Sequence, residues 1–173
     1  MSRIAANQFN LEKYKELYEE KKLIDDAFDK LYDSDCQDVI KKTLLALLVE
    51  LGELANETNC FKYWIDKKPS PDPIILEEYA DCMLMAMFFC RNLDISLDEN
   101  FDEVKENTLV EQFIYLYREC SSLLNDYRKE RVKSILVNLI YLGYLMGYDD
   151  TQLVDAGLSK IKKNKLRFVG DFQ

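Results

Sequence analysis

Apolar residues recur along most of the chain at intervals of three and four positions, which is the spacing of α-helices. The first segment has a single apolar stripe among charged residues, as in an amphipathic helix at a protein surface. The second and third are apolar on most sides, as in buried helices. The predicted helices cover residues 9–32, 36–59, 73–92, 103–127 and 129–147, and a last helix with a basic end follows Asp149 and Asp150.

Few residues interrupt this helical pattern. The chain of 173 residues has five Gly and three Pro, and all three Pro lie in the segment KYWIDKKPSPDP between the second and third helices. Asp72 is expected to be an N-cap, with Pro73 in the first helical turn. We therefore predict one all-α domain over residues 1–173, a helical bundle of five to six helices with the second and third as a central antiparallel pair.

Charge and residue usage exclude several classes of function. The net charge of −9 argues against binding of nucleic acid, which needs a basic surface. The chain has no His, so His-based triads and His-ligated zinc are excluded. Five Cys without CxxC spacing indicate reduced thiols and a cytoplasmic protein. The N-terminus lacks an apolar signal core, and no segment approaches the roughly 18 apolar residues of a membrane span.

Two acidic pairs stand in the two most apolar predicted helices. Glu50 and Glu53 lie one turn apart in LLALLVELGELANE, and Glu78 and Asp81 repeat that spacing in the next helix. If the helices pack side by side, four carboxylates converge. Their repulsion is relieved by protonation, by Lys or Arg partners, or by divalent cations.

Oxygen ligands alone favour hard cations, so Mg²⁺ or Mn²⁺ with a phosphate-bearing substrate is the expected occupant of such a cluster. The alternative is that the two pairs lie on solvated helix faces and are neutralised by Lys. A di-iron site is excluded, because it needs Glu-x-x-His motifs.

The run LLVELGELANETNCFKYWIDKKPSPDPIILEEYAD resembles the all-α nucleoside triphosphate pyrophosphatases of the MazG-like superfamily, and specifically their dimeric dUTPase branch. This resemblance implies a homodimer that hydrolyses dUTP, and dUDP as well, to dUMP with Mg²⁺, or Mn²⁺ as a substitute. The implied metal ligands are Glu50, Glu53, Glu78 and Asp81. Among these, Glu50 and Glu53 are the implied catalytic residues, with Glu53 as the general base that activates the attacking water.

The resemblance also implies residues that bind the substrate. Lys160, Asn164 and Arg167 match a Lys, Asn and Arg that contact phosphates in the family, and Lys62 and Trp64 lie in the loop between the acidic motifs. Trp64 is expected to flank the base or the sugar, with a place in the core or a dimer interface as the alternative. For Lys160 and Arg167 the alternative is a solvated basic helix end.

Two positions depart from the family pattern, and both concern base recognition. Leu84 stands where the family commonly has a His. Tyr14 stands near the place of a Gln that reads uracil, with Gln8 or Asn10 as alternatives. Two other functions therefore remain open. One is a house-cleaning pyrophosphatase with another base preference, such as dCTP or a modified nucleotide. The other is a non-catalytic helical interaction module.

Apolar side chains beyond the needs of a small core would support the implied homodimer. The side chains expected to supply them are Tyr117, Leu123, Tyr141, Tyr144 and Met146.

Overall fold

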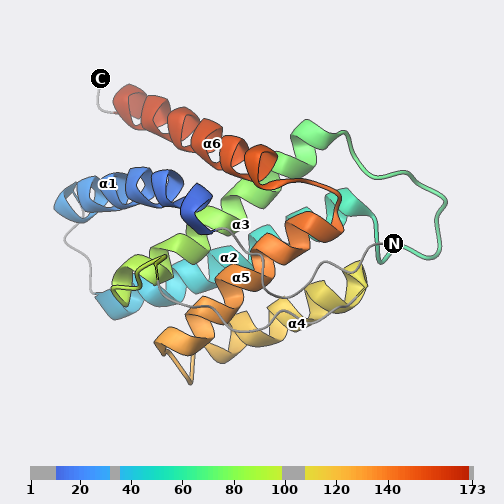
Figure 1. The fold of residues 1–173 in the computed structure, drawn as a ribbon, viewed down its shortest axis with the longest axis horizontal. Helices are drawn as coiled ribbons and strands as arrows, with labels where there is room; N and C mark the ends of the chain where they lie inside the picture. The colour runs from blue at the N-terminus through green and yellow to red at the C-terminus, as the bar shows by residue number, and fades with distance from the viewer. Residues whose placement is uncertain (1–10, 32–35, 99–107, 172–173) are drawn as a thin grey trace.

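The computed structural model describes residues 11–31, 36–98 and 108–171, without the side chains of residues 31, 36–37 and 167–171. This part of the chain contains one 3₁₀ turn and six α-helices (Figure 1). They are η1 (Leu11–Tyr14), α1 (Lys15–Leu31), α2 (Cys36–Thr58), α3 (Asp72–Asn92), α4 (Leu109–Ser122), α5 (Lys129–Leu145) and α6 (Asp150–Asp171). The prediction of an all-α bundle is confirmed.

Helices α2 and α3 run antiparallel through the middle of the molecule (Figure 1). Their inner faces are fully buried, for example at Leu47 and Leu51 of α2 and at Met83 and Met87 of α3. Helix α3 also contacts α1, α5 and α6, while α4 packs against α2 and α5. Helix α3 is therefore enclosed by other helices on most sides, which explains its apolar sequence, whereas α2 keeps one side open to solvent with Leu45 and Val49 exposed on it.

Two predicted helix ends differ from the structure. Helix α3 begins at Asp72 itself, so Asp72 is not the N-cap; Pro71 is, and it has no side-chain cap. The Asp72 carboxylate instead accepts a hydrogen bond of 3.0 Å from the Tyr148 hydroxyl. The helix predicted over 103–127 ends at Ser122, where turn hydrogen bonds from the next residues replace the helical pattern.

The start predicted for that helix lies outside the described residues. Within them, α4 follows a capping box, in which the Thr108 side chain accepts from the Glu111 N–H and the Glu111 carboxylate accepts from the Thr108 N–H. The prediction for the last helix is confirmed: Asp149 caps α6 by accepting from the Gln152 N–H at 2.9 Å.

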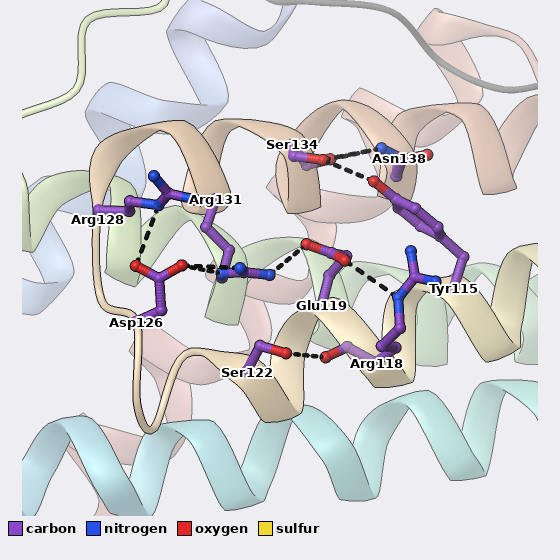
Figure 2. Close-up of polar contacts among 9 residues, drawn as sticks. All are labelled: Tyr115, Arg118, Glu119, Ser122, Asp126, Arg128, Arg131, Ser134 and Asn138. Atoms are coloured by element: carbon purple, nitrogen blue, oxygen red, sulfur yellow. Dashed lines mark hydrogen bonds and ion pairs between the residues drawn. The ribbon is translucent and has the colours of Figure 1, made fainter.

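A polar network joins α4 to α5 at the end of the bundle (Figure 2). Arg131 donates to Glu119 at 2.5 Å and to Asp126 at 2.8 Å, and the hydroxyls of Tyr115 and Ser134 lie 3.1 Å apart. One guanidinium bonds to α4 and to the turn between α4 and α5. The network therefore holds these two helices at a fixed angle to each other.

The apolar side chains expected beyond the core are mostly part of it. Leu123 and Tyr141 are buried, and Tyr117, Tyr144 and Met146 are partly buried against the core. The sequence prediction of surplus apolar surface at these five positions is therefore wrong. These residues lie on α4 and α5 or directly after them, with the spacing of one helix face. The sequence alone does not show whether such a face packs against another helix or is exposed.

The described cysteines Cys60, Cys82, Cys90 and Cys120 are free thiols. None of the helices in the described part of the chain combines the length and the hydropathy needed to cross a membrane.

Gly157 allows α6 to approach α1 closely. A Cβ atom at this position would lie 2.6 Å from Cδ2 of Leu17, a fully buried side chain of α1. The absence of a side chain therefore sets the position of α6, including that of Lys160 one turn later.

We expect Gly157→Val to lower the free energy of unfolding by about 1–3 kcal/mol, because overpacking against Leu17 outweighs the small gain in helix propensity. Urea denaturation measures this change. The control is Ser159→Ala at an exposed position of the same helix, which should change stability little. Equal stability of the two variants would show that α6 tolerates displacement from α1.

Candidate active site

Three carboxylates from the central helices converge. One oxygen atom each from Glu50 of α2 and from Glu78 and Asp81 of α3 lies within 4.8 Å of the other two. The spacing of three residues puts Glu78 and Asp81 on one face of α3, and the antiparallel packing of α2 brings Glu50 opposite them. We call these three residues the carboxylate cluster.

Glu53 is not part of this cluster. It is exposed on α2, one turn after Glu50. Its negative charge nevertheless contributes to the electrostatics of Glu50 and Glu78, so it lies near them. The structure thus brings together three of the four acidic residues of the two motifs and places the fourth beside them, where solvent reaches it.

Crowding changes the acidity of the cluster. Burial raises the pKa of Glu50 to about 7, and the charges of Asp81 and Glu53 add to the effect. Burial also raises the pKa of Glu78, again with help from Asp81 and Glu53. Without a cation, the folded protein therefore favours partial protonation of Glu50 near neutral pH.

A lysine from α6 neutralises part of the remaining charge. The Lys160 ammonium lies 2.5 Å from Asp81 and 3.3 Å from Glu77, and Lys163 lies 2.8 Å from Glu77. Burial opposes the charge of Lys160, but the bonds to Asp81 and Glu77 outweigh it and raise its pKa. Partial protonation and pairing with a lysine, two of the three ways to relieve carboxylate repulsion, are therefore both present.

The other predicted substrate-binding residues have different surroundings. Asn164 follows Lys160 by one turn of α6 and is partly buried, while the side chain of Arg167 lies outside the described residues. In the loop after α2, Lys62 donates to Asn59 Oδ1 at 2.8 Å. Trp64 is exposed in the same loop, which projects from the bundle (Figure 1).

The aromatic rings of this loop contact one another. The Trp64 ring makes edge contacts with Tyr63 and Phe61, whose ring centroids lie 5.2 Å and 6.0 Å away. These contacts of Lys62 and Trp64 lie within the loop and the end of α2, and the structure does not bring the two side chains to the carboxylate cluster.

The donor set of the cluster fits a divalent cation. It offers only carboxylate oxygens, from two rigid helices, within 4.8 Å of one another. Mg²⁺ and Mn²⁺ prefer such ligands, and Mg²⁺ usually keeps several waters while bound by one or two carboxylates and substrate phosphates. Three carboxylates and a nearby ammonium can therefore form one side of a site for a cation and a phosphate.

Comparison with protein families identifies the chain. A family model described as dUTPase matches residues 13–172, which include both acidic motifs, the loop between them and α6. The chain belongs to the dUTPase family. It is therefore an enzyme that hydrolyses dUTP to dUMP and pyrophosphate, and the resemblance of its acidic motifs is confirmed. The comparison with curated proteins found no match.

In this dUTPase, Tyr14, which stands near the place of the family Gln, is buried, and its hydroxyl donates to Asp150 at 3.0 Å. Gln8 and Asn10 lie outside the described residues. Leu84, at the position of the family His, is buried in the core.

Two charged features of this dUTPase were not predicted from the sequence. Glu77, which directly precedes Glu78, links Lys160 to Lys163. Lys21 and Asp25 form a buried ion pair on α1. Their spacing of four residues is the available signal, but exposed ion pairs share that spacing and are far more common.

Glu50 makes the stability of the metal-free dUTPase depend on pH. Its pKa is raised from an ordinary value of 4.5 to about 7, so the folded state binds more protons than the unfolded chain between these values. The free energy of unfolding should therefore fall as the pH rises through this window. In EDTA at pH 8, we expect Glu50→Gln to melt a few degrees above wild type, and at pH 5 the two should differ much less.

Thermal denaturation followed by circular dichroism measures both differences. Glu16→Gln, at an exposed position of α1, controls for the loss of one negative charge. A gain for Glu50→Gln of the same size at both pH values would contradict the crowded cluster.

Proposed function

We propose that this dUTPase uses Mg²⁺, or Mn²⁺ in its place, held by Glu50, Glu78 and Asp81, and that Glu53 is the general base. The observation that supports this proposal is the convergence of three carboxylate oxygens from two helices beside an ammonium group. A carboxylate cluster in which burial raises the pKa of Glu50 and a lysine pairs with Asp81 is also one that a cation would stabilise.

The reaction needs a nucleophile, an electrophile and a leaving group. When bound, the cation would lower the pKa of a water molecule and neutralise phosphate oxygens. Glu53 takes the proton of the attacking water as its oxygen bonds to the α-phosphorus. The bond from that phosphorus to the bridging oxygen breaks, and pyrophosphate leaves with the bonding electron pair. Glu53 suits this role because its carboxylate is exposed to solvent water beside the cluster.

Lys160 belongs to the same proposal as a phosphate-binding residue. Its ammonium is held at the edge of the cluster by Asp81 and Glu77, and it can turn from Asp81 to a phosphate oxygen of the substrate. Asn164 and Arg167 extend the phosphate site along α6, while Lys62 and Trp64 approach the base or sugar from the loop. Because attack at the α-phosphorus does not require the γ-phosphate, dUDP is a substrate as well.

We also propose that two copies of the chain form a homodimer through an apolar patch of Leu45 and Val49 on α2 and Val110 and Ile114 on α4. All four side chains are exposed. The two helices meet where the Tyr117 hydroxyl donates to the Leu48 carbonyl, so the two halves of the patch lie on neighbouring helices. For chains with a net charge of −9, an uncharged patch is the surface where two copies approach with least repulsion.

The unpaired thiols of the described cysteines support a cytoplasmic location for this enzyme. The same compartment contains the deoxynucleotides on which it acts.

For the homodimer, we expect Ile114→Asp to shift the sedimenting species from dimer to monomer, because it buries a charge in the proposed interface. Analytical ultracentrifugation measures the change. Leu166→Asp, at an exposed apolar position of α6, is the matched control and should remain dimeric. A wild-type monomer at micromolar concentration would refute the proposal.

For the chemistry, we expect Glu53→Gln to lower kcat for dUTP by about 100- to 10,000-fold, the usual contribution of a general base. Pyrophosphate release in the presence of Mg²⁺ measures the change. The variant should keep the rise in Tm that Mg²⁺ causes in wild type, because the carboxylate cluster is intact.

Two results would overturn the assignments. An active Glu53→Gln enzyme would show that Glu53 is not the general base. A wild-type Tm that does not change at saturating Mg²⁺ would show that the protein has no preformed cation site.

A further inference from the structure

Helix α4 contacts α2 at the turn that carries the first acidic motif. The Tyr117 hydroxyl donates a hydrogen bond of 3.2 Å to the backbone carbonyl of Leu48. In a regular α-helix this carbonyl also accepts from the N–H of Gly52, four residues later. The turn between these two residues contains Glu50, and Glu53 follows it directly. A side chain of α4 is therefore bonded to the backbone that positions both glutamates.

Gly52 makes room for this hydroxyl. A Cβ atom at position 52 would lie 2.9 Å from the Tyr117 oxygen, which is closer than side-chain carbons approach other atoms. The oxygen stands at the end of a rigid aromatic ring that is partly buried against the core. The absence of a side chain at Gly52 therefore allows the hydroxyl to reach the Leu48 carbonyl.

The surroundings of Tyr117 keep its hydroxyl protonated. Burial raises the pKa of Tyr117, and smaller contributions come from Cys82 and Cys120. A protonated hydroxyl donates to a carbonyl, which has no proton of its own to give. Because Cys82 directly follows Asp81 on α3, the same ring lies close to both helices of the carboxylate cluster.

We propose that Tyr117 is a positioning residue of this dUTPase: its bond to the Leu48 carbonyl holds the turn of α2 in the orientation that aims Glu50 and Glu53 at the reacting phosphate. This inference rests on the proposed roles of the two glutamates. Tyr117 acts through the backbone of α2 and not by contact with the substrate. Without the bond the turn is free to shift, and a displacement of about 1 Å is enough to slow a reaction that depends on alignment.

Removal of one oxygen atom tests this role. We expect Tyr117→Phe to lower kcat for dUTP by about three- to thirtyfold and to change KM by less than about twofold, because alignment is lost and affinity is kept. Pyrophosphate release in the presence of Mg²⁺ measures both constants, and circular dichroism gives the Tm. A merely structural role would lower Tm and leave kcat per folded molecule unchanged.

The matched control is Tyr115→Phe. Tyr115 lies two positions earlier on α4, and its hydroxyl is 3.1 Å from that of Ser134 on α5 (Figure 2). The same atom is therefore removed from the same helix without a change in the contact with α2. This variant should have the kcat of wild type.

Substitution of Gly52 provides an independent test of the same contact. Gly52→Ala adds the Cβ atom that displaces the hydroxyl, and it should lower kcat about as much as Tyr117→Phe, although alanine favours the helix. In the Tyr117→Phe background there is no oxygen to displace, so Gly52→Ala should have little further effect. Additive losses of kcat in this double-mutant cycle would show that the two positions act independently and would overturn the inference.

A second double variant separates this inference from the proposed chemistry. If Tyr117 acts through Glu53, the addition of Tyr117→Phe to Glu53→Gln should cause no further loss of kcat. A slow Tyr117→Phe enzyme together with an active Glu53→Gln enzyme would refute the proposed base and support positioning through Glu50 alone.

Three results would count against Tyr117. A folded Tyr117→Phe enzyme with the kcat of wild type overturns the inference, even when Glu53→Gln is inactive. An equal loss of kcat in Tyr115→Phe overturns it as well, because the effect then belongs to α4 as a whole. Should Tyr117→Phe fail to fold, an unchanged kcat for folded Gly52→Ala overturns it.

Discussion

Mutual repulsion of carboxylates on the facing sides of α2 and α3 is the constraint on which the rest of this structure depends. Two like charges about 4 Å apart cost roughly 4 kcal/mol near a protein surface. Protonation and the Lys160 ammonium relieve part of this repulsion, and rigid neighbours prevent the remaining charges from moving apart. The fully buried leucines of α2 and methionines of α3 provide that rigidity, since they pack between the two helices.

The outer helices have distinct parts in this arrangement. Helix α6 brings the Lys160 ammonium to the cluster. Its close approach to the core depends on two glycines, Gly157 against Leu17 and Gly143 of α5 against Leu153. Helix α1 packs against α3 and α6 and carries the Lys21–Asp25 ion pair, while α4 packs against α2 and α5. The central pair thus holds the carboxylate cluster, and the other helices pack around it.

The sequence was sufficient for the parts of the molecule that depend on spacing along one helix. Apolar periodicity predicted the helices and the central pair, and the three-residue steps predicted the acidic residues that α2 and α3 bring together. The position of Glu53 could not be predicted from the sequence. A step of three residues turns the side chain by about 60° around the helix axis, and the packing of the neighbouring helices decides whether a side chain at that angle still points into the site. Likewise, the sequence of Lys21 and Asp25 is the same for a solvated pair and for a buried one. Family membership followed from the motif residues, because their spacing lies within a single stretch of the chain.

The ion pair between Lys160 and Asp81 has a consequence for how the proposed cation binds. A lysine attached to α6 is a tethered competitor, because it occupies a carboxylate ligand at a high effective concentration whatever the composition of the solution. Metal affinity is then set by the exchange of one counterion for another and not by the carboxylates alone. Substrate phosphates would draw the ammonium away and so release the ligand, which would make the binding of nucleotide and the binding of metal favour each other.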